Sequence, residues 1–149
     1  MIAVAEVHEL VGRWWFSYDA ADFDELRRLL TDDATFRCRT DTGNADWEEF
    51  VRADLTGADQ VMAWMSEHRL GSPDPLRHNA TNIHLTERAD DAASFESYIS
   101  VTQIVAGMPS PLSSGIVRGS VRAAGDELRI ADLQLILDTL ESVPLSDRQ

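Results

Sequence analysis

Hydrophobic and polar residues in the first part of the chain alternate with the period of an α-helix. Apolar and aromatic side chains recur every three or four residues from about Ala3 to Tyr18, which predicts one amphipathic helix. The stripe consists of Val4, Val7, His8, Val11, Trp14, Trp15 and Tyr18. Asp19 follows Trp15 by four positions and should share its helix face. The helix therefore ends with a tyrosine and an aspartate that should face a cavity.

Shorter elements are predicted between this helix and residue 70. A second helix is predicted over Phe23–Leu30, capped by Asp22, and a strand over Ala34–Arg39. A polar loop follows over Asp41–Asp54, with a helical turn near Trp47–Phe50. A third helix, capped by Thr56, should end near His68. The caps are predicted because short polar side chains accept main-chain N–H groups at helix starts. Asp32 and Asp33 are expected to be solvated turn residues.

Strand patterns follow the break at Gly71-Ser-Pro-Asp-Pro75. The predicted strands are Leu76–Thr86, Ala92–Val105, Gly115–Ala123 and Leu128–Leu137. Their connections, including a loop over residues 107–111, are short and rich in turn residues, so neighbouring strands should pair antiparallel. Helices followed by strands predict an α+β fold, with three N-terminal helices packed in the concavity of a curved, mostly antiparallel sheet. One domain is expected over residues 1–149, with a flexible tail from about residue 141.

The composition narrows the class of protein. The net charge of −13 disfavours nucleic acid and anionic membranes as partners, because phosphate binding needs a basic surface. All 13 basic residues are arginine, which excludes a lysine Schiff base or a P-loop lysine and is typical of a GC-rich bacterial genome. Cys38 is the only cysteine, so no internal disulfide can form, and a cytoplasmic location is expected.

Neither membrane insertion nor export is expected from the sequence. No apolar run approaches the roughly 20 residues that span a bilayer. Glu6 and His8 interrupt the N-terminal apolar run and no basic leader precedes it, so a signal peptide is not expected. A chain of 149 residues is long enough to bury a core and a ligand cavity.

Polar side chains interrupt the apolar faces of two predicted strands. In the strand that begins near Leu76, His78 should share a face with Asn82 and His84. On the next strand one face carries Phe95, Ser97, Ile99, Val101 and Gln103. An apolar wall with a few polar groups is typical of a small-molecule pocket, and equally of a half-buried sheet. His78 and His84 are roughly 20 Å apart along the strand, so they cannot serve the same site.

Tyr18, Asp19 and His78 are a candidate acid–base set. Histidine transfers protons near neutral pH, and a carboxylate bonded to its second nitrogen fixes its tautomer. A phenol can donate a hydrogen bond to a carbonyl or enolate oxygen as negative charge develops there. The same residues are compatible with a structural role, in which Tyr18 caps the core, Asp19 ends the helix and His78 is a satisfied strand histidine.

Other chemistry has less support in the sequence. The histidines show no ligand spacing, so no metal site and no cofactor are expected. Cys38 has no activating neighbour and is expected to be a small buried residue. A carboxylate beside an arginine could open an epoxide. Asp132 with Arg118 or Arg129 is the candidate for that reaction, and strand parity alone leaves it open.

Four short motifs and the order of elements connect the chain to a known group of proteins. The motifs are Ser17-Tyr18-Asp19-Ala-Ala-Asp22-Phe-Asp24-Glu-Leu26-Arg27, Leu76-Arg77-His78 followed by Thr81-Asn82, Asp90-Asp91-Ala92, and Leu128-Arg129-Ile130. With the element order over nearly the whole chain, they resemble the cone-shaped α+β barrels. This group includes scytalone dehydratase, SnoaL-type polyketide cyclases, ketosteroid isomerase and nuclear transport factor 2. The resemblance implies a cone-shaped barrel and a homodimer or homotrimer.

The resemblance to scytalone dehydratase also implies roles for individual residues. His78 would remove a proton next to a ketone, Asp19 would orient His78, and Tyr18 would stabilise the carbonyl oxygen. Cys38 stands where a second tyrosine is expected, and Gln103 stands where a second histidine is expected. Gln103 can form hydrogen bonds but cannot protonate a leaving group at neutral pH. The substrate is expected to contact Gln103, Asn82, Cys38, Trp15, Phe95 and Val101.

The favoured hypothesis is a cytoplasmic, cofactor-independent lyase or isomerase of the dehydratase type. Its substrate would be a cyclic or polyketide-like small molecule, with His78 as an Asp-oriented base. The alternatives are a SnoaL-type cyclase or an epoxide-opening hydrolase of secondary metabolism, and a non-catalytic ligand-binding or assembly domain of the same fold. In a non-catalytic domain, His78 and Asp19 would lie beyond hydrogen-bond reach of each other.

Overall fold

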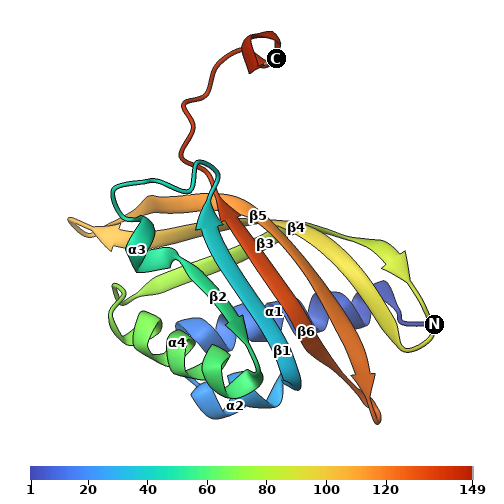
Figure 1. The fold of residues 1–149 in the computed structure, drawn as a ribbon. Helices are drawn as coiled ribbons and strands as arrows, with labels where there is room; N and C mark the ends of the chain where they lie inside the picture. Colours follow the sequence, from blue (N-terminus) through green and yellow to red (C-terminus); the bar gives the residue numbers. More distant parts are fainter. Residues whose placement is uncertain (149) are drawn as a thin grey trace.

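Helices cover one face of a curved sheet in the computed structural model, which describes residues 1–148 (Figure 1). The helices are α1 (Val4–Asp19), α2 (Phe23–Arg28), α3 (Glu48–Val51), α4 (Ala58–Leu70) and the 3₁₀ helix η1 (Leu145–Arg148). The strands are β1 (Leu30–Thr40), β2 (Ala53–Thr56), β3 (Leu76–Arg88), β4 (Ala92–Val105), β5 (Met108–Ala124) and β6 (Glu127–Leu137). The predicted α+β class is confirmed.

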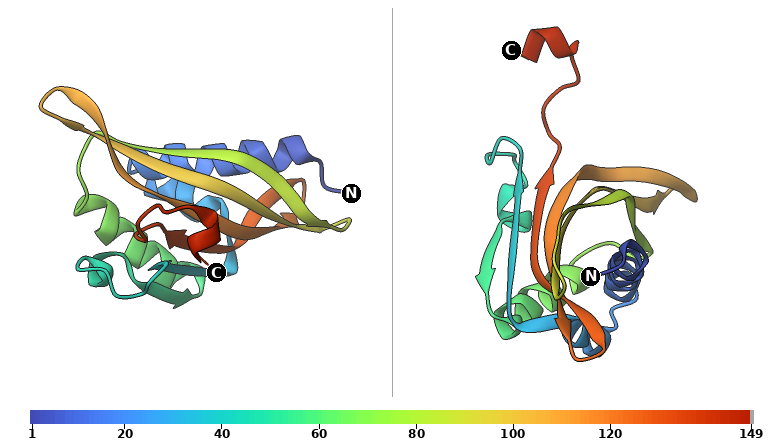
Figure 2. Two further views of the ribbon diagram at one scale, coloured as in Figure 1. Left: turned by 90° about the horizontal axis from the view of Figure 1, so that it is seen from above. Right: turned by 90° about the vertical axis from the view of Figure 1, so that its right-hand side faces the viewer.

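The strands of the six-stranded sheet lie in the order β2-β1-β6-β5-β4-β3. Neighbouring strands are antiparallel except for β1 and β6, which are parallel. The long strands coil around α1, so the sheet is concave on the side of the helices (Figure 2). Helix α1 contacts β3 on this face and α4 contacts β1. This arrangement confirms a curved, mostly antiparallel sheet with N-terminal helices in its concavity.

Helix α1 buries five of the seven residues of its predicted stripe, whereas Val4 and His8 are exposed. Its buried side chains are Val7, Leu10, Val11, Trp14, Trp15, Ser17 and Tyr18. At the start of the helix, the Glu6 carboxylate accepts the main-chain N–H of Ala3 at 2.9 Å, which satisfies a donor that the helix leaves free. At its end, Ala21 adopts a φ of 56° and turns the chain. The Asp22 carboxylate then accepts the main-chain N–H of Glu25 at 3.2 Å and caps α2, as predicted.

The boundaries of α2 and β1 differ from the prediction. The helix ends at Arg28 and the strand already begins at Leu30, so Asp32 and Asp33 are strand residues and not turn residues. Ion pairs with arginines hold both carboxylates at the surface. The register with β6 shifts near the start of β1, and this bulge accommodates the polar residues there.

Strand β2 lies where a loop was predicted. Residues 53–56 pair antiparallel with β1, and Thr56 is the last strand residue. Gly57, with a φ of 94°, precedes α4 without a side-chain cap, so the predicted cap by Thr56 is wrong. Short edge strands limit further pairing of a sheet, and the four residues of β2 are too few to establish an alternating pattern in the sequence.

Strands β4 and β5 form a long hairpin where a loop over residues 107–111 was predicted. A two-residue turn joins them, in which Ala106 and Gly107 have φ values of 51° and 77°. Pro109 and Pro111 belong to β5. They lie beyond Gly115, which pairs with the last residue of β6, so their missing N–H groups interrupt no pairing with β6.

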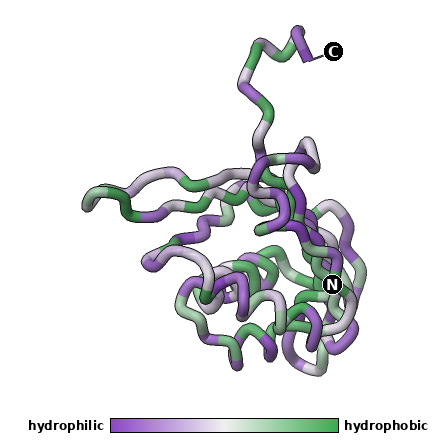
Figure 3. The backbone as a smooth tube through the Cα atoms, turned by 60° about the vertical axis from the view of Figure 1, so that its left-hand side comes forward, coloured by the Kyte–Doolittle hydropathy of each residue, from purple (hydrophilic) through white to green (hydrophobic). Residues whose placement is uncertain are grey.

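Two segments project from the barrel. Hydrophobic residues reach the tip of the β4–β5 hairpin, where Ile104, Val105 and Met108 are 47%, 50% and 65% exposed (Figure 3). After β6 the chain leaves the sheet and leads to η1 (Figure 1). Within residues 1–148, no helix combines the length and the apolar character needed to cross a membrane.

A bulge in β3 reverses the side-chain alternation predicted for this strand. The register with β4 shifts just before His84, and Asn82 adopts a φ of 56°. Ile83 and Leu85 therefore pack against the core, while Asn82 and His84 are exposed. The prediction that Asn82 and His84 share a face with His78 is wrong for this reason.

Candidate active site

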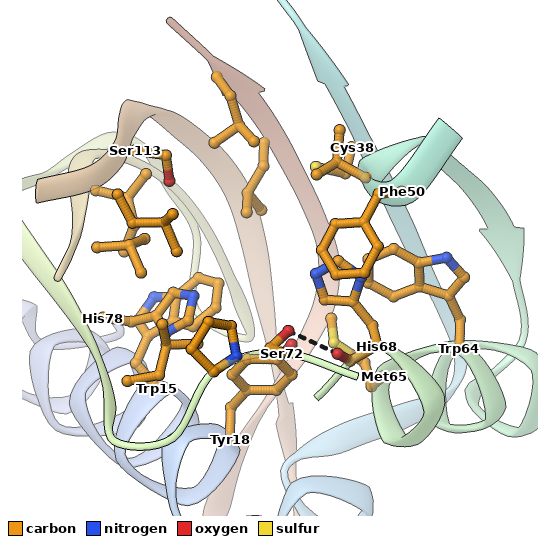
Figure 4. Close-up of a pocket in the computed structure, with 18 of the residues that line it drawn as sticks. Trp15, Tyr18, Cys38, Phe50, Trp64, Met65, His68, Ser72, His78 and Ser113 are labelled. Atoms are coloured by element: carbon orange, nitrogen blue, oxygen red, sulfur yellow. Dashed lines mark hydrogen bonds between the residues drawn. The ribbon is translucent and has the colours of Figure 1, made fainter. Parts of the chain in front are cut away.

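A cavity of about 320 Å³ lies between the concave face of the sheet and the helices α1, α3 and α4 (Figure 4). Its wall is mainly apolar and aromatic. The aromatic and histidine side chains that line it are Trp15, Tyr18, Phe36, Trp47, Phe50, Trp64, His68 and His78. Among the described residues, no aspartate, glutamate or arginine lines the cavity. Because an unpaired charge is costly in an apolar environment, the wall favours an uncharged ligand.

Asp19 and His78 meet at one side of this cavity. Asp19 is the last residue of α1, and His78 lies near the start of β3. The Asp19 Oδ1 atom is 2.6 Å from the His78 Nδ1 atom, and Oδ2 accepts the main-chain N–H of His78 at 2.8 Å. Both side chains are about nine-tenths buried, with exposures of 9% and 11%. The predicted pair is therefore brought together within hydrogen-bond distance.

The two contacts to Asp19 define which nitrogen of His78 can act as a base. An ionised carboxylate only accepts hydrogen bonds, so the geometry assigns the ring proton to Nδ1. Within residues 1–148, no group forms a hydrogen bond with the second ring nitrogen, Nε2. The Nε2 lone pair is thus available on a side chain that lines the cavity.

Aromatic rings from α1 hold the imidazole of His78 in place. Trp15 stacks on it with ring centroids 4.8 Å apart and an interplanar angle of 4°. Tyr18 meets it edge-on, with centroids 5.1 Å apart. Burial raises the pKa of the Tyr18 phenol above its usual range and outweighs the opposing effects of Arg69 and Ser72. Tyr18 therefore stays protonated at neutral pH and can donate a hydrogen bond.

Arg69 fixes the end of α1. Its side chain is 5% exposed and donates to the main-chain oxygen of Asp19 from Nε at 3.1 Å and from Nη2 at 2.9 Å. The same guanidinium donates to the main-chain oxygen of Pro73 at 3.0 Å and pairs with Asp74 at 2.7 Å. Arg69 thus connects the end of α4, the end of α1 and the turn that leads to His78.

A second histidine lines the cavity opposite this pair. His68 on α4 lies between two aromatic rings, stacked on Trp64 with centroids 4.3 Å apart and tilted against Phe50 with centroids 4.4 Å apart. Figure 4 shows these three side chains on one side of the cavity and Trp15 with His78 on the other. Burial lowers the pKa of His68 from 6.5 to about 4, although a hydrogen bond with the main chain of Phe50 opposes this shift. His68 is therefore uncharged at neutral pH.

Of the six side chains that were predicted to contact substrate, three line the cavity and three lie outside its lining. Trp15, Cys38 and Val101 line the cavity. Burial raises the pKa of the Cys38 thiol to about 12, so it is a neutral part of the wall at neutral pH.

The other three predicted contacts lie outside the cavity lining. Phe95 is 1% exposed and belongs to the core beneath Gly119. Gln103 lies on the face of Val101, two residues farther along β4 toward the hairpin tip. Asn82 is exposed in the β3 bulge. Their predicted position in the pocket is corrected, for Asn82 because of the bulge and for the others because the cavity ends before it reaches them.

The residues proposed for epoxide opening do not meet at this cavity. Asp132 contacts Thr35 and lies 3.9 Å from Arg37. Arg118 forms an exposed ion pair with Glu96 at 2.9 Å. Among residues 1–148, no group of three or more histidine, cysteine, aspartate or glutamate side chains is arranged to hold a metal ion.

The sequence interpretation missed several residues of the cavity wall, and His68 is the histidine among them. It follows Trp64 by four positions on α4, so the two side chains share a helix face. That spacing was available in the sequence. The third helix, however, was predicted to end near His68.

Comparisons with known proteins agree with this fold. A family model described as a SnoaL-like domain matches residues 1–134. An NTF2-like protein with a cystatin-like fold from Novosphingobium aromaticivorans shares 19% identity with a TM-score of 0.71, over 97% of this chain and 85% of that chain. A search of curated protein sequences found no significant match.

Two further solved structures are similar over nearly the whole chain. A candidate scytalone dehydratase from Novosphingobium aromaticivorans is 12% identical, with a TM-score of 0.72 over 91% of this chain and 83% of that chain. The β subunit of benzoate 1,2-dioxygenase from Burkholderia mallei is 16% identical, with a TM-score of 0.70 over 92% of this chain and 91% of that chain. At these identities the similarity shows a shared fold.

Proposed function

The chain belongs to the SnoaL-like family, and on that premise we propose that it is a lyase or isomerase that removes a proton next to the carbonyl group of a small molecule. The observation that supports this most is the 2.6 Å contact between Asp19 and His78 at the wall of an apolar cavity. Burying a carboxylate is costly, and a histidine with only a structural role does not require one. Buried carboxylate–imidazole pairs in clefts are typical of proton-transfer sites.

Each member of the site has one role in the proposed step. His78 takes the carbon-bound proton on Nε2, and the electron pair moves into the carbonyl group to form an enolate. Asp19 keeps the proton on Nδ1 and stabilises the imidazolium. Tyr18 donates a hydrogen bond to the enolate oxygen. The step moves a proton only, so it needs no electron carrier, and elimination, isomerisation or ring closure can follow it.

Hydrogen–deuterium exchange tests the step without knowledge of the natural substrate. The protein is incubated in D₂O with a panel of cyclic ketones that includes cyclohexanone and α-tetralone, and NMR follows the loss of protons next to the carbonyl group. We expect the protein to accelerate exchange, and His78→Gln to lower the rate by about 10²–10⁴-fold, the usual contribution of a general base.

His84→Gln is the matched control, because it makes the same substitution at an exposed histidine of the same strand. It should exchange at the wild-type rate, and circular dichroism should show that both variants are folded. Equal rates for wild type and His78→Gln would contradict the proposal. So would ketones that bind in the cavity without any acceleration of exchange.

A second candidate function is ligand binding without turnover. Its support is that Gln103, expected where a second histidine would assist the leaving group, lies outside the cavity lining. The Asp19–His78 contact disfavours this function, since a binding domain has no need of an oriented base. Tight ketone binding, seen by quenching of tryptophan fluorescence, together with no exchange would favour it.

A further inference from the structure

His68 is a cavity side chain for which the proposed proton transfer has no role. It projects from α4 into the wall that Phe50 and Trp64 also form, opposite His78 (Figure 4). The two aromatic rings restrict the imidazole plane to one orientation. A side chain held in this way presents its ring nitrogens in fixed directions, which favours recognition of a specific polar group.

The chemistry of the surrounding wall narrows what His68 could recognise. Phe36, Phe50 and Met65 are apolar parts of the same cavity wall, and no charged side chain of the described residues lines the cavity. An anionic group would lack a cationic partner there, and it would approach a cavity that already adjoins the Asp19 carboxylate. An uncharged oxygen, as in a hydroxyl or a carbonyl group, is the ligand atom that a neutral imidazole suits.

We propose that His68 is a ligand-positioning residue, whose imidazole hydrogen-bonds an oxygen atom of an uncharged ring compound on the wall opposite Asp19 and His78. This inference rests on the proposed function, because it places the reacting carbonyl group at Tyr18 and His78. The preferred ligand then carries two oxygen functions on opposite sides of its ring system. The lowered pKa of His68 agrees with this role, since the imidazole remains neutral at physiological pH.

Two matched ligands test the inference by binding. α-Tetralone carries one carbonyl oxygen, and 4-hydroxy-α-tetralone adds a hydroxyl group at the opposite position of the same ring. Calorimetry should show that wild type binds the hydroxy ketone about five- to tenfold more tightly, the effect of one neutral hydrogen bond. In His68→Phe, which keeps an aromatic ring between Phe50 and Trp64, the preference should fall below about twofold while α-tetralone still binds.

Further variants separate a polar role from a packing role. His68→Gln retains a hydrogen-bonding group and should recover part of the preference for the hydroxy ketone. Phe50→Leu alters the same wall without a polar group and should weaken both ligands equally. Equal binding of the two ligands by wild type would overturn the inference. A preference for the hydroxy ketone that persists in His68→Phe would also overturn it. The same holds if that variant loses affinity for both ligands to the same extent.

Repeating the calorimetric binding of the two ketones in His78→Gln, which lacks the proposed base, separates this inference from the proposed function. If the preference depends on His68 but no ketone exchanges its protons, the proposed function fails and His68 remains a ligand contact. If exchange depends on His78 but the preference does not depend on His68, only the role of His68 fails.

Discussion

His78 and His68 lie in similar aromatic surroundings but have different polar partners. His78 stacks on Trp15 with centroids 4.8 Å apart, and His68 stacks on Trp64 with centroids 4.3 Å apart. The carboxylate of Asp19 contacts Nδ1 of His78 at 2.6 Å, whereas among the described residues no carboxylate pairs with His68. Without such a partner, burial lowers the pKa of His68 to about 4.

The comparison shows that burial and stacking alone do not produce a base. Desolvation disfavours the charged form of an imidazole, so a buried histidine without a carboxylate holds a proton poorly. A carboxylate on the second nitrogen stabilises the imidazolium that forms when the first nitrogen takes a proton. The wall with Asp19 is therefore suited to proton transfer, and the wall without it is suited to neutral hydrogen bonding.

The largest expected effect comes from Asp19→Asn, which removes the carboxylate that distinguishes His78 from His68. Asp19→Asn offers one acceptor oxygen where His78 presents two N–H groups, so either a contact is lost or the ring adopts the tautomer with the proton on Nε2. We expect the rate of ketone proton exchange to fall by about 10²–10⁴-fold. Asp24→Asn, at an exposed aspartate of α2, is the control. A folded Asp19→Asn protein with the wild-type rate would show that the carboxylate is dispensable.

A smaller effect is expected at Arg69, which connects the wall that contains His68 with the wall that contains Asp19. Arg69 follows His68 in α4 and donates twice to the main-chain oxygen of Asp19, so Arg69→Gln removes buried charge-assisted hydrogen bonds. Urea unfolding should show a loss of about 2–4 kcal/mol. Arg77→Gln, at an exposed arginine near the start of β3, should change stability by less than about 0.5 kcal/mol. Equal midpoints for the two variants would refute the anchoring role.

The pH dependence of the free energy of unfolding should show the lowered pKa of His68, the histidine in the wall that lacks a carboxylate. The pKa of His68 is about 4 in the folded state against 6.5 as its ordinary value, so between these values only the unfolded state binds the proton. Stability therefore falls as the pH is lowered from 6.5 toward 4, and this contribution is constant below 4. His68→Phe lacks it, while the acidic groups common to both proteins cancel. Parallel stability curves for wild type and variant would contradict the lowered pKa.

The smallest effect is expected at Cys38, which lines the cavity and has no hydrogen-bond partner among residues 1–148. Its pKa of about 12 keeps the thiol protonated at neutral pH, so it contributes surface and no chemistry. Cys38→Ala should alter the exchange rate by less than about threefold, equivalent to under 1 kcal/mol. A loss as large as that in Asp19→Asn would assign Cys38 a direct role in the reaction.

Sequence patterns predicted the cavity wall with Asp19 and His78 better than the opposite wall with His68. The stripe of α1 places Trp15, Tyr18 and Asp19 on one face, and His78 lies at the start of a strand whose break is clear in the sequence. Both signals are local, because helix and strand periods determine which side chains share a face. The fold class followed from the order of the elements. The pairing of Asp19 with His78 was proposed from the types and positions of the residues, and the resemblance then favoured it.

The rest depended on features that leave little local signal. The β3 bulge reverses alternation after His78 and places Asn82 outside, although no glycine or proline marks it. Strand β2 is only four residues long, which is too short for a clear pattern. The prolines of β5 suggested a loop, although they occupy positions without a β6 partner. His68 required the orientation of α4 against the sheet, which packing determines and periodicity does not.

The tautomer of His78 tests the central claim most directly, because it requires no substrate. Selective ¹⁵N labelling and NMR at a pH where the imidazole is neutral can identify which ring nitrogen carries the proton. We predict a protonated Nδ1 bonded to Asp19 and an unprotonated Nε2, and in Asp19→Asn this preference should be lost. A wild-type protein with the proton on Nε2 would contradict the account, since His78 could not then accept a proton from a ligand in the cavity.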